Sequence, residues 1–245
     1  MKRELIQKLK EQGVDGLPHE WFSSALGEVE IKQSENIPEQ SQPASIESHS
    51  HLIKIERLSS MSLETLKAEA QSCRDCRLCE ERKNVVFGVG NTLSPLVCFV
   101  GEGPGADEDR VGEPFVGKAG ELLTAAITKG LGLKREEVYI CNVVKCRPPQ
   151  NRTPLPDEVA ACSPFLYRQI ELIKPKVIVT LGAPAQLAIS GKQGGITKIR
   201  GSWLSFRGIK VMPTFHPAYI LRNPEAKRPF WEDLQKVMKE LGLGN

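Results

Sequence analysis

The sequence lacks the long apolar segments of membrane proteins, and its first residues lack the apolar stretch of a secretory signal. No hydrophobic run approaches the roughly 18 residues of a transmembrane helix. The opening MKRELIQKLKEQG is charged throughout, so a signal peptide is not expected. The seven cysteines are an odd number, which in a reducing compartment indicates thiols or metal ligands rather than a disulfide framework. We therefore expect a cytoplasmic protein.

Charge is distributed unevenly along the 245 residues, although the net charge is only +3. Residues 1–61 have a balance of −3 and residues 62–245 a balance of +6. A mildly basic body favours a polyanionic partner only slightly, because many enzymes with neutral substrates are equally basic.

The first 60 residues are predicted to form an appendage. A short amphipathic helical pattern opens the chain, and residues 28–51 are polar, unperiodic and rich in Ser, Gln and Glu. Such a composition buries too little apolar surface to offset the entropy of ordering, so 28–51 is predicted to be a flexible linker. The helix before it either docks a partner protein or packs on the main domain, which is predicted to span 62–243.

The main domain alternates short apolar runs with amphipathic stretches. The runs are near-continuous and β-branched, as in buried strands, and cover residues 95–101, 137–144, 175–182 and 209–215. Helical patterns lie at about 118–131, 156–173, 183–190 and 229–242. This alternation predicts an α/β fold with a central parallel four-stranded sheet flanked by helices. Residues 203–208 are expected to add a hairpin arm.

The first strand ends in the glycine-rich turn GEGPGADED, residues 101–109. In open parallel sheets the site lies beyond the carboxyl ends of the strands, so this turn is a candidate. A phosphate loop fits poorly, because no Gly-Lys-Ser/Thr follows and four carboxylates would repel phosphate. The turn suits a neutral ligand that approaches backbone N–H groups, or a reaction that develops positive charge.

Three further side chains stand near predicted strand ends. Phe115 lies between turn formers, where it either stacks on a planar ligand or anchors the loop to the core. Asn142 interrupts an apolar strand and either presents its amide to a pyrimidine edge or bonds to backbone. His216, the only histidine of the main domain, ends the last strand where a catalytic imidazole would be placed. The apolar residues 219–221 after it either wedge into a base stack or cap the core.

The segment SCRDCRLCEERK contains Cys73-x2-Cys76, with Cys79 shortly after. Two thiolates so spaced reach one centre from a single turn, which indicates zinc or iron–sulfur ligation. The remaining ligands are expected from Cys146 and Cys162. Two other cysteines, at 98 and 141, lie within apolar strands and are expected to be inert core thiols.

Five motifs in order resemble those of the family 4 uracil-DNA glycosylases, which are iron–sulfur enzymes: GEGPG, PFVGKAG, CNVVKCRPPQNRTP, ITKIRG and FHPAYILRNP. The likeness covers about 62–241. It implies the three-layer uracil-DNA glycosylase fold and a [4Fe–4S] cluster with a structural role, held by Cys73, Cys76, Cys146 and Cys162. Cys79 departs from the family pattern and leaves an alternative ligand open.

The resemblance also implies an activity: hydrolysis of the N-glycosidic bond of deoxyuridine in single- or double-stranded DNA, which releases uracil and leaves an abasic site for base excision repair. Uracil would contact Glu102, Gly103, Phe115, Asn142 and a neutral His216. His216 would stabilise the leaving base, and Glu108 or Glu102 the sugar cation and the water. DNA would meet residues of two segments: Tyr219, Ile220, Leu221 and Arg222, and Lys145, Arg147 and Arg152.

A covalent subtype within the superfamily uses a histidine in a basic loop, and RPPQNRTPLPDE after Cys146 contains none. We expect a monomer in the cytoplasm or on the nucleoid. The alternatives are a cluster-containing DNA-binding module without catalytic activity and a nucleotide- or phosphate-binding α/β protein.

Overall fold

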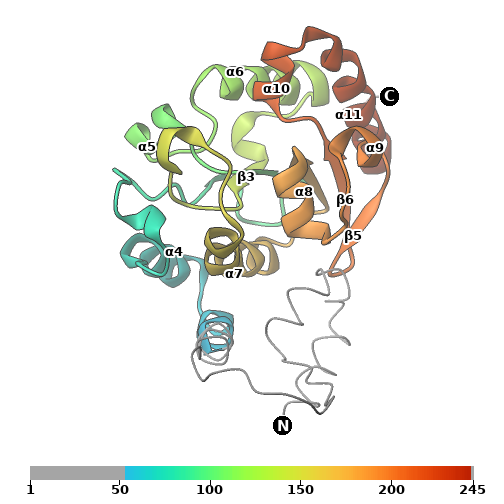
Figure 1. Ribbon diagram of the computed structural model, residues 1–245. Helices are drawn as coiled ribbons and strands as arrows, with labels where there is room; N and C mark the ends of the chain where they lie inside the picture. The colour runs from blue at the N-terminus through green and yellow to red at the C-terminus, as the bar shows by residue number, and fades with distance from the viewer. Residues whose placement is uncertain (1–52, 244–245) are drawn as a thin grey trace, which may run out of the picture.

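The computed structural model describes residues 53–243 (Figure 1). The predicted front helix and the 28–51 linker lie outside these residues. Within them, no helix is both long and apolar enough to cross a membrane.

A single six-stranded sheet forms the centre, with strand order β1-β3-β2-β4-β6-β5. Its strands are β1 (Val89–Gly90), β2 (Val97–Gly101), β3 (Tyr139–Asn142), β4 (Val177–Leu181), β5 (Leu204–Phe206) and β6 (Ile209–Thr214). The four predicted strands are the central four, and they are parallel. The predicted count of four was wrong, because short antiparallel strands flank them: β5 is the expected hairpin arm, and β1, two residues long, is too short for a sequence pattern.

Helices cover both faces of the sheet and make three layers (Figure 1). They are α4 (Leu63–Ser72), α5 (Ala106–Val111), α6 (Lys118–Ala125), α7 (Pro156–Ile173), α8 (Ala183–Ser190), α9 (Ile196–Ile199), α10 (Pro217–Arg222) and α11 (Lys227–Leu241). A π-helical segment, Ala126–Leu131, continues α6. Short 3-10 turns lie at Arg77–Cys79, Arg135–Glu137, Pro149–Asn151 and Pro224–Ala226.

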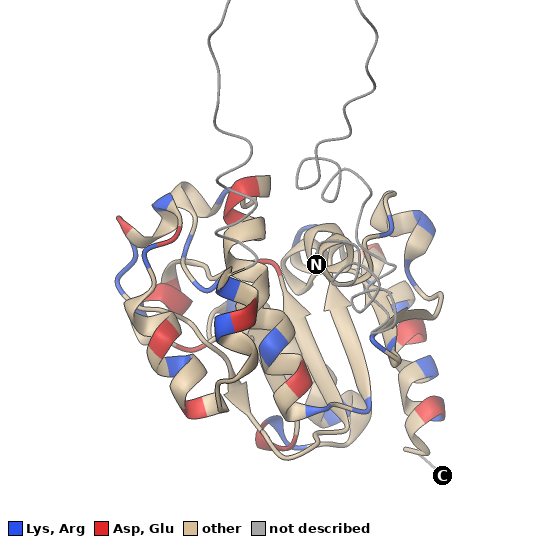
Figure 2. Cartoon of the chain, turned by 90° about the horizontal axis from the view of Figure 1, so that it is seen from below, with Lys and Arg blue, Asp and Glu red and all other residues tan. Residues whose placement is uncertain are grey.

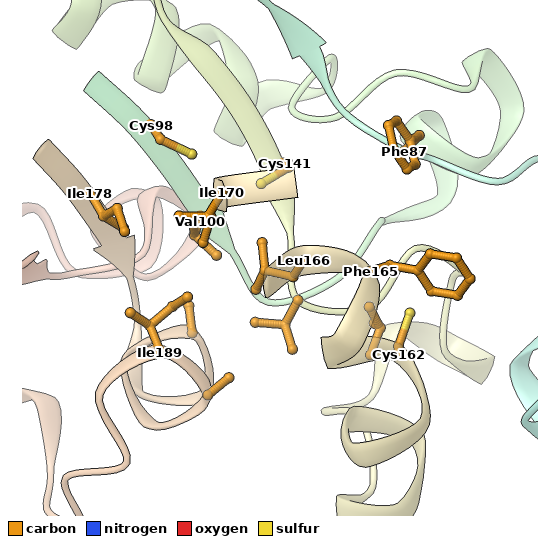
Figure 3. Close-up of a cluster of buried hydrophobic side chains, with 14 of the residues drawn as sticks. Phe87, Cys98, Val100, Cys141, Cys162, Phe165, Leu166, Ile170, Ile178 and Ile189 are labelled. Carbon is orange, nitrogen blue, oxygen red and sulfur yellow. The ribbon is translucent and has the colours of Figure 1, made fainter. Parts of the chain in front are cut away.

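Alternate side chains of each strand supply two separate cores. Cys98 and Val100 of β2 pack with α4, α7 and α8, whereas Val97 and Phe99 pack with α6, the π-helical segment and α11. Figure 3 shows the first core, in which strand side chains meet Leu166 of α7. The strands are almost free of charge, while the surrounding helices display both signs (Figure 2). Burial on both faces explains why the strands are continuous apolar runs.

Residues 53–60 pack on the domain, although they were predicted to belong to the appendage. Residues 53–59 are helical, and Leu58 is buried in the first core. The ammonium of Lys54 donates to the carbonyl of Ala161 at 2.5 Å and pairs with Asp75 at 2.6 Å. The domain therefore includes residues from at least 53 onward, nine residues before its predicted start at 62. The sequence did not indicate this helix, because the helix is short and only one of its sides is buried.

A buried ion pair supports the end of β6 and accounts for the ITKIRG motif. Asp233 of α11 is fully buried and receives two hydrogen bonds from the guanidinium of Arg200, at 2.9 and 2.7 Å. The hydroxyl of Thr214, the last residue of β6, donates to the same carboxylate at 2.6 Å. Breaking a buried pair of this kind leaves one charge uncompensated. The pair thus holds α11 against the strand that leads into His216.

Candidate functional site

A cavity of about 430 Å³ lies beyond the carboxyl ends of β2, β3 and β6. Its volume is in the range of small-molecule sites, and its position is the one expected for an open parallel sheet. The five residues predicted to contact the base all line it: Glu102, Gly103, Phe115, Asn142 and His216. Four distant segments of the sequence therefore meet at one cavity.

Asn142 presents an unpaired acceptor to this cavity. It is the last residue of β3, its side chain is 2% exposed, and its Oδ1 has no hydrogen-bond partner in the described part of the chain. A buried acceptor without a partner is rare and costs about 1–3 kcal/mol. A ligand N–H would satisfy it.

Gly101 makes room for both Asn142 and Phe115. It pairs with Asn142 across β2 and β3, and a Cβ built on it would stand 2.3 Å from Oδ1 of Asn142 and 2.6 Å from Cζ of Phe115. Both distances are far below van der Waals contact. The position therefore requires glycine for reasons of space, although its backbone is ordinary strand.

His216 is held as a neutral hydrogen-bond donor. It is the N-cap of α10, and its Nδ1 accepts the backbone N–H of Ala218 at 3.1 Å, so the ring proton is on Nε2. Burial lowers its pKa to about 4, and the charge of Arg222 acts in the same direction. Near neutral pH the imidazole is therefore uncharged. Its ring lies 5.6 Å from that of Phe115.

Glu108 joins the turn after β2 to the turn that contains Phe115. One carboxylate oxygen accepts the backbone N–H of Gly105 at 3.0 Å. The other accepts those of Val116 and Gly117 at 3.1 and 3.3 Å. These three bonds give Glu108 a positioning role that the sequence did not reveal.

Arg135 holds the opposite side of the Phe115 turn. Its guanidinium donates to the carbonyls of Pro114 and Phe115 at 2.8 and 3.0 Å. Phe115 has a left-handed backbone with φ of 55°, which is strained for a non-glycine residue and needs such support. A Cβ at Gly120 would stand 1.9 Å from the carbonyl oxygen of Phe115. Phe115 is only 5% exposed and belongs to the second core. The same side chain also lines the cavity.

Glu102 is the carboxylate that remains available to a ligand. It lines the cavity, and burial raises its pKa, while a hydrogen bond from the hydroxyl of Thr153 acts in the opposite direction. Asp107 and Asp109 are directed elsewhere: the first pairs with Arg110, and the second caps the backbone N–H groups of residues 83 and 84. Thr153 was missed because nothing in its sequence context marks it.

Residues 219–222 lie within α10, and only some of their side chains are exposed. Tyr219 and Leu221 are 41% and 48% exposed, whereas Ile220 is 2% exposed and belongs to the second core. The prediction that Ile220 contacts DNA is therefore wrong, because helical geometry turns it inward between two outward neighbours. Tyr219 and Arg222 also line the cavity.

The basic residues predicted to contact DNA also differ in burial and in hydrogen-bond partners. Lys145 is 2% exposed and its ammonium donates to the carbonyl of Asn142 at 2.8 Å, so its assignment to DNA is wrong. Arg152 lines the cavity but binds the buried carboxylate of Glu158 through two hydrogen bonds, at 2.8 and 2.7 Å. Arg147 donates to the side chain of Asn151 at 2.7 Å. Sequence position alone did not distinguish buried from exposed cations.

A second cavity gathers the cysteines. Its lining includes Cys73, Cys76, Cys79, Cys146 and Cys162. In the described residues no three His, Cys, Asp or Glu side chains are close enough to hold one metal ion. The five thiols come from three separate segments of the chain and line one cavity, and a four-iron cluster takes four such thiolates as ligands.

The surroundings of these sulfurs also fit a cluster. Arg82 donates to Sγ of Cys146 at 3.1 Å, and the backbone N–H of Lys145 donates to Sγ of Cys162 at 3.3 Å. Hydrogen bonds to the sulfurs are a usual feature of iron–sulfur sites. Burial raises the pKa of Cys76 to about 11 and that of Cys162 to about 12. As free thiols they stay protonated at neutral pH, and ligation is what would make them thiolates.

Comparisons with known proteins identify the family to which the chain belongs. The Uracil DNA glycosylase superfamily matches residues 87–235. The type-4 uracil-DNA glycosylase of Thermotoga maritima is 53% identical over 181 residues, which cover 71% of this chain and 92% of the relative. That of Sulfurisphaera tokodaii is 48% identical over 190 residues, which cover 74% and 86%. A type-5 uracil-DNA glycosylase of Pyrobaculum aerophilum is 31% identical over 163 residues, which cover 60% and 71%. The chain belongs to the uracil-DNA glycosylase superfamily and, within it, to the type-4 family.

We expect Gly101→Ala to lower the free energy of unfolding by about 1–3 kcal/mol, because the new methyl group overpacks the wall of the cavity. Urea unfolding of the full chain measures the change. Gly195→Ala is the matched control, since no atom lies within 4 Å of the Cβ site and the backbone φ is −66°. Equal unfolding midpoints for the two variants would contradict the close packing of Gly101, Asn142 and Phe115.

Proposed function

We propose that this chain is a uracil-DNA glycosylase, a monofunctional hydrolase of DNA repair that cleaves the N-glycosidic bond of deoxyuridine and leaves an abasic site. The names of its relatives support this activity. The observation that supports it within the molecule is a pair of groups that line one cavity: the buried, unpaired acceptor of Asn142 and the neutral imidazole of His216.

The edge of uracil matches the amide of Asn142. Its N3–H would donate to Oδ1, and its O4 would accept from the amide nitrogen. Cytosine presents an acceptor at N3 and an amino donor at position 4, so it leaves the buried Oδ1 unpaired. A site built on such hydrogen bonds rejects the mismatched ligand by factors of about 10⁴–10⁵. Phe115 would stack on the extruded ring.

The remaining groups match the charges that develop during the reaction. Glycosidic cleavage passes through an oxocarbenium-like sugar, and here the departing uracil takes the negative charge. The Nε2–H of His216 would donate to uracil O2, where that charge develops, together with backbone N–H groups of the turn at Glu102 and Gly103. The carboxylate of Glu102 would stabilise the sugar cation and orient the attacking water. Glu108 is bound by three N–H groups and would fix Phe115 in place. It is therefore less available than Glu102 to stabilise the sugar cation.

The exposed face of α10 is the part that would meet the DNA. Tyr219 and Leu221 would fill the gap that the extruded base leaves, and Arg222 beside them would contact phosphate. Arg147 and Arg152 would add positive charge, reduced at Arg152 by its carboxylate partner. Binding to single- or double-stranded DNA by one copy of the chain would then weaken with salt.

A [4Fe–4S] cluster held by Cys73, Cys76, Cys146 and Cys162 is part of the proposal. When bound, it would cross-link the 73–79 loop to the segment after β3. Cys79 lines the same cavity and is available as a substitute ligand. No step of base release passes through the cluster.

Base release from a single-stranded oligonucleotide with one uracil tests the proposal. The full chain, loaded with iron, should release uracil and leave thymine and cytosine in place. Asn142→Ala should lower kcat/KM for uracil by about 100-fold or more, because its polar contacts are lost. Asn91→Ala, in the turn after β1, is the control and should retain wild-type rates.

Two outcomes would contradict the proposal, and each would contradict a different part of it. An iron-loaded chain that binds the oligonucleotide and releases no uracil would overturn the enzyme assignment and leave a DNA-binding module. Full activity in Asn142→Ala would overturn the role of the amide.

A second prediction concerns Leu221. Leu221→Ala should slow uracil release from duplex DNA about tenfold and leave release from single strands nearly unchanged, because only the duplex needs a side chain to replace the extruded base. Steady-state rates on both substrates measure the ratio. Leu93→Ala, at a residue that is 84% exposed beyond the opposite end of the sheet, is the matched control. Equal slowing on both substrates would contradict the wedge.

A further inference from the structure

Lys145 stands between the two cavities. It is three residues after Asn142 and one residue before Cys146. Its ammonium donates to the carbonyl of Asn142 at 2.8 Å, and its backbone N–H donates to Sγ of Cys162 at 3.3 Å. Lys145 itself lines the cysteine cavity, and Asn142 lines the other. One residue thus contacts the groups of both sites.

The charge of Lys145 has no carboxylate partner. In the described residues no Asp or Glu oxygen lies within 4 Å of Nζ, whose neighbours are the Asn142 carbonyl and, at 5.8 Å, the centre of the Phe87 ring. Lysine is rarely buried to this degree unless an anion pairs with it, because removing an ammonium from water costs several kcal/mol. Lys145 lines the cavity that the proposed cluster ligands also line, so an anion held in that cavity would be its partner.

A cluster on four thiolates would supply that anion. Four thiolate charges exceed the charge of an oxidised four-iron, four-sulfide core, so the assembly is negative overall. A fixed cation beside it would offset this charge and favour retention of the cluster. The same cation, through its hydrogen bond, would fix the peptide of Asn142 at the end of β3.

We propose that Lys145 is a positioning residue that couples the cluster to the uracil pocket: its charge compensates the cluster, and its hydrogen bond orients Asn142. This inference rests on the proposed function and cofactor. It assigns to Lys145 two separable properties, charge and hydrogen bonding. Two substitutions can separate them.

Lys145→Gln removes the charge and keeps a donor, whereas Lys145→Met removes both and keeps the apolar stem. Full-length proteins are purified without oxygen, with Lys239→Met on α11 as an exposed control. Two quantities are measured: the rate of iron loss to a chelator, followed by the visible absorbance, and kcat and KM for uracil release from single-stranded DNA.

Both neutral variants should lose iron severalfold faster than wild type and the control. Uracil release should separate them: kcat/KM should stay within about twofold of wild type in Lys145→Gln and fall about tenfold in Lys145→Met. A general defect of folding would move both quantities together in both variants, which would contradict the proposal.

Wild-type iron loss in both variants would overturn the charge role. Equal rates of uracil release in Lys145→Gln and Lys145→Met would overturn the coupling to Asn142. Wild-type protein that contains no iron or releases no uracil would instead overturn the proposed function, which keeps the two failures distinct.

Discussion

The close approach of Gly101, Asn142 and Phe115 is the constraint on which the proposed uracil pocket depends. A parallel pairing of β2 with β3 places the glycine directly beside the asparagine, and the absent Cβ leaves the space that the amide and the aromatic ring occupy. The ring is held there against an unfavourable backbone conformation by Glu108 on one side and Arg135 on the other. Rigid placement of this kind matters because a buried amide discriminates between bases only when it cannot turn to find another partner.

The segment that follows β3 serves both sites. It starts from Asn142, the last residue of β3, in one cavity and continues through Cys146 to Cys162 in the other. Backbone bonds from residues 143 and 144 to the carbonyls of Gly101 and Glu102 hold its start against the turn after β2. A cross-link at the cysteines would therefore stabilise the pocket without contacting the base, which agrees with a structural role for the cluster.

Much of the fold was predictable from the sequence, because strands buried on both faces are continuous apolar runs and their order indicated parallel pairing. The edge strand β1 was not predictable, since two residues are too few to show a repeating hydrophobic pattern. The pocket residues were predictable where a side chain was out of place for its context, as with Asn142 in a strand. Arg135 gave no such signal, because its partners lie 20 and 21 residues away in the chain. Lys145 and Ile220 were misassigned because burial depends on how elements pack, and sequence position alone does not report it.

The state of the His216 imidazole tests the central claim most directly, because the proposed stabilisation of the leaving base rests on a neutral ring with its proton on Nε2. Nitrogen NMR of the labelled full chain, with His216→Gln to assign the signal, gives both properties. The pKa is lowered to about 4, so at pH 5.5 the folded protein should show a neutral ring, protonated at Nε2, that shifts when uracil is added. An imidazolium at pH 5.5, titrating near the ordinary value of about 6.5, or a proton on Nδ1, would contradict it.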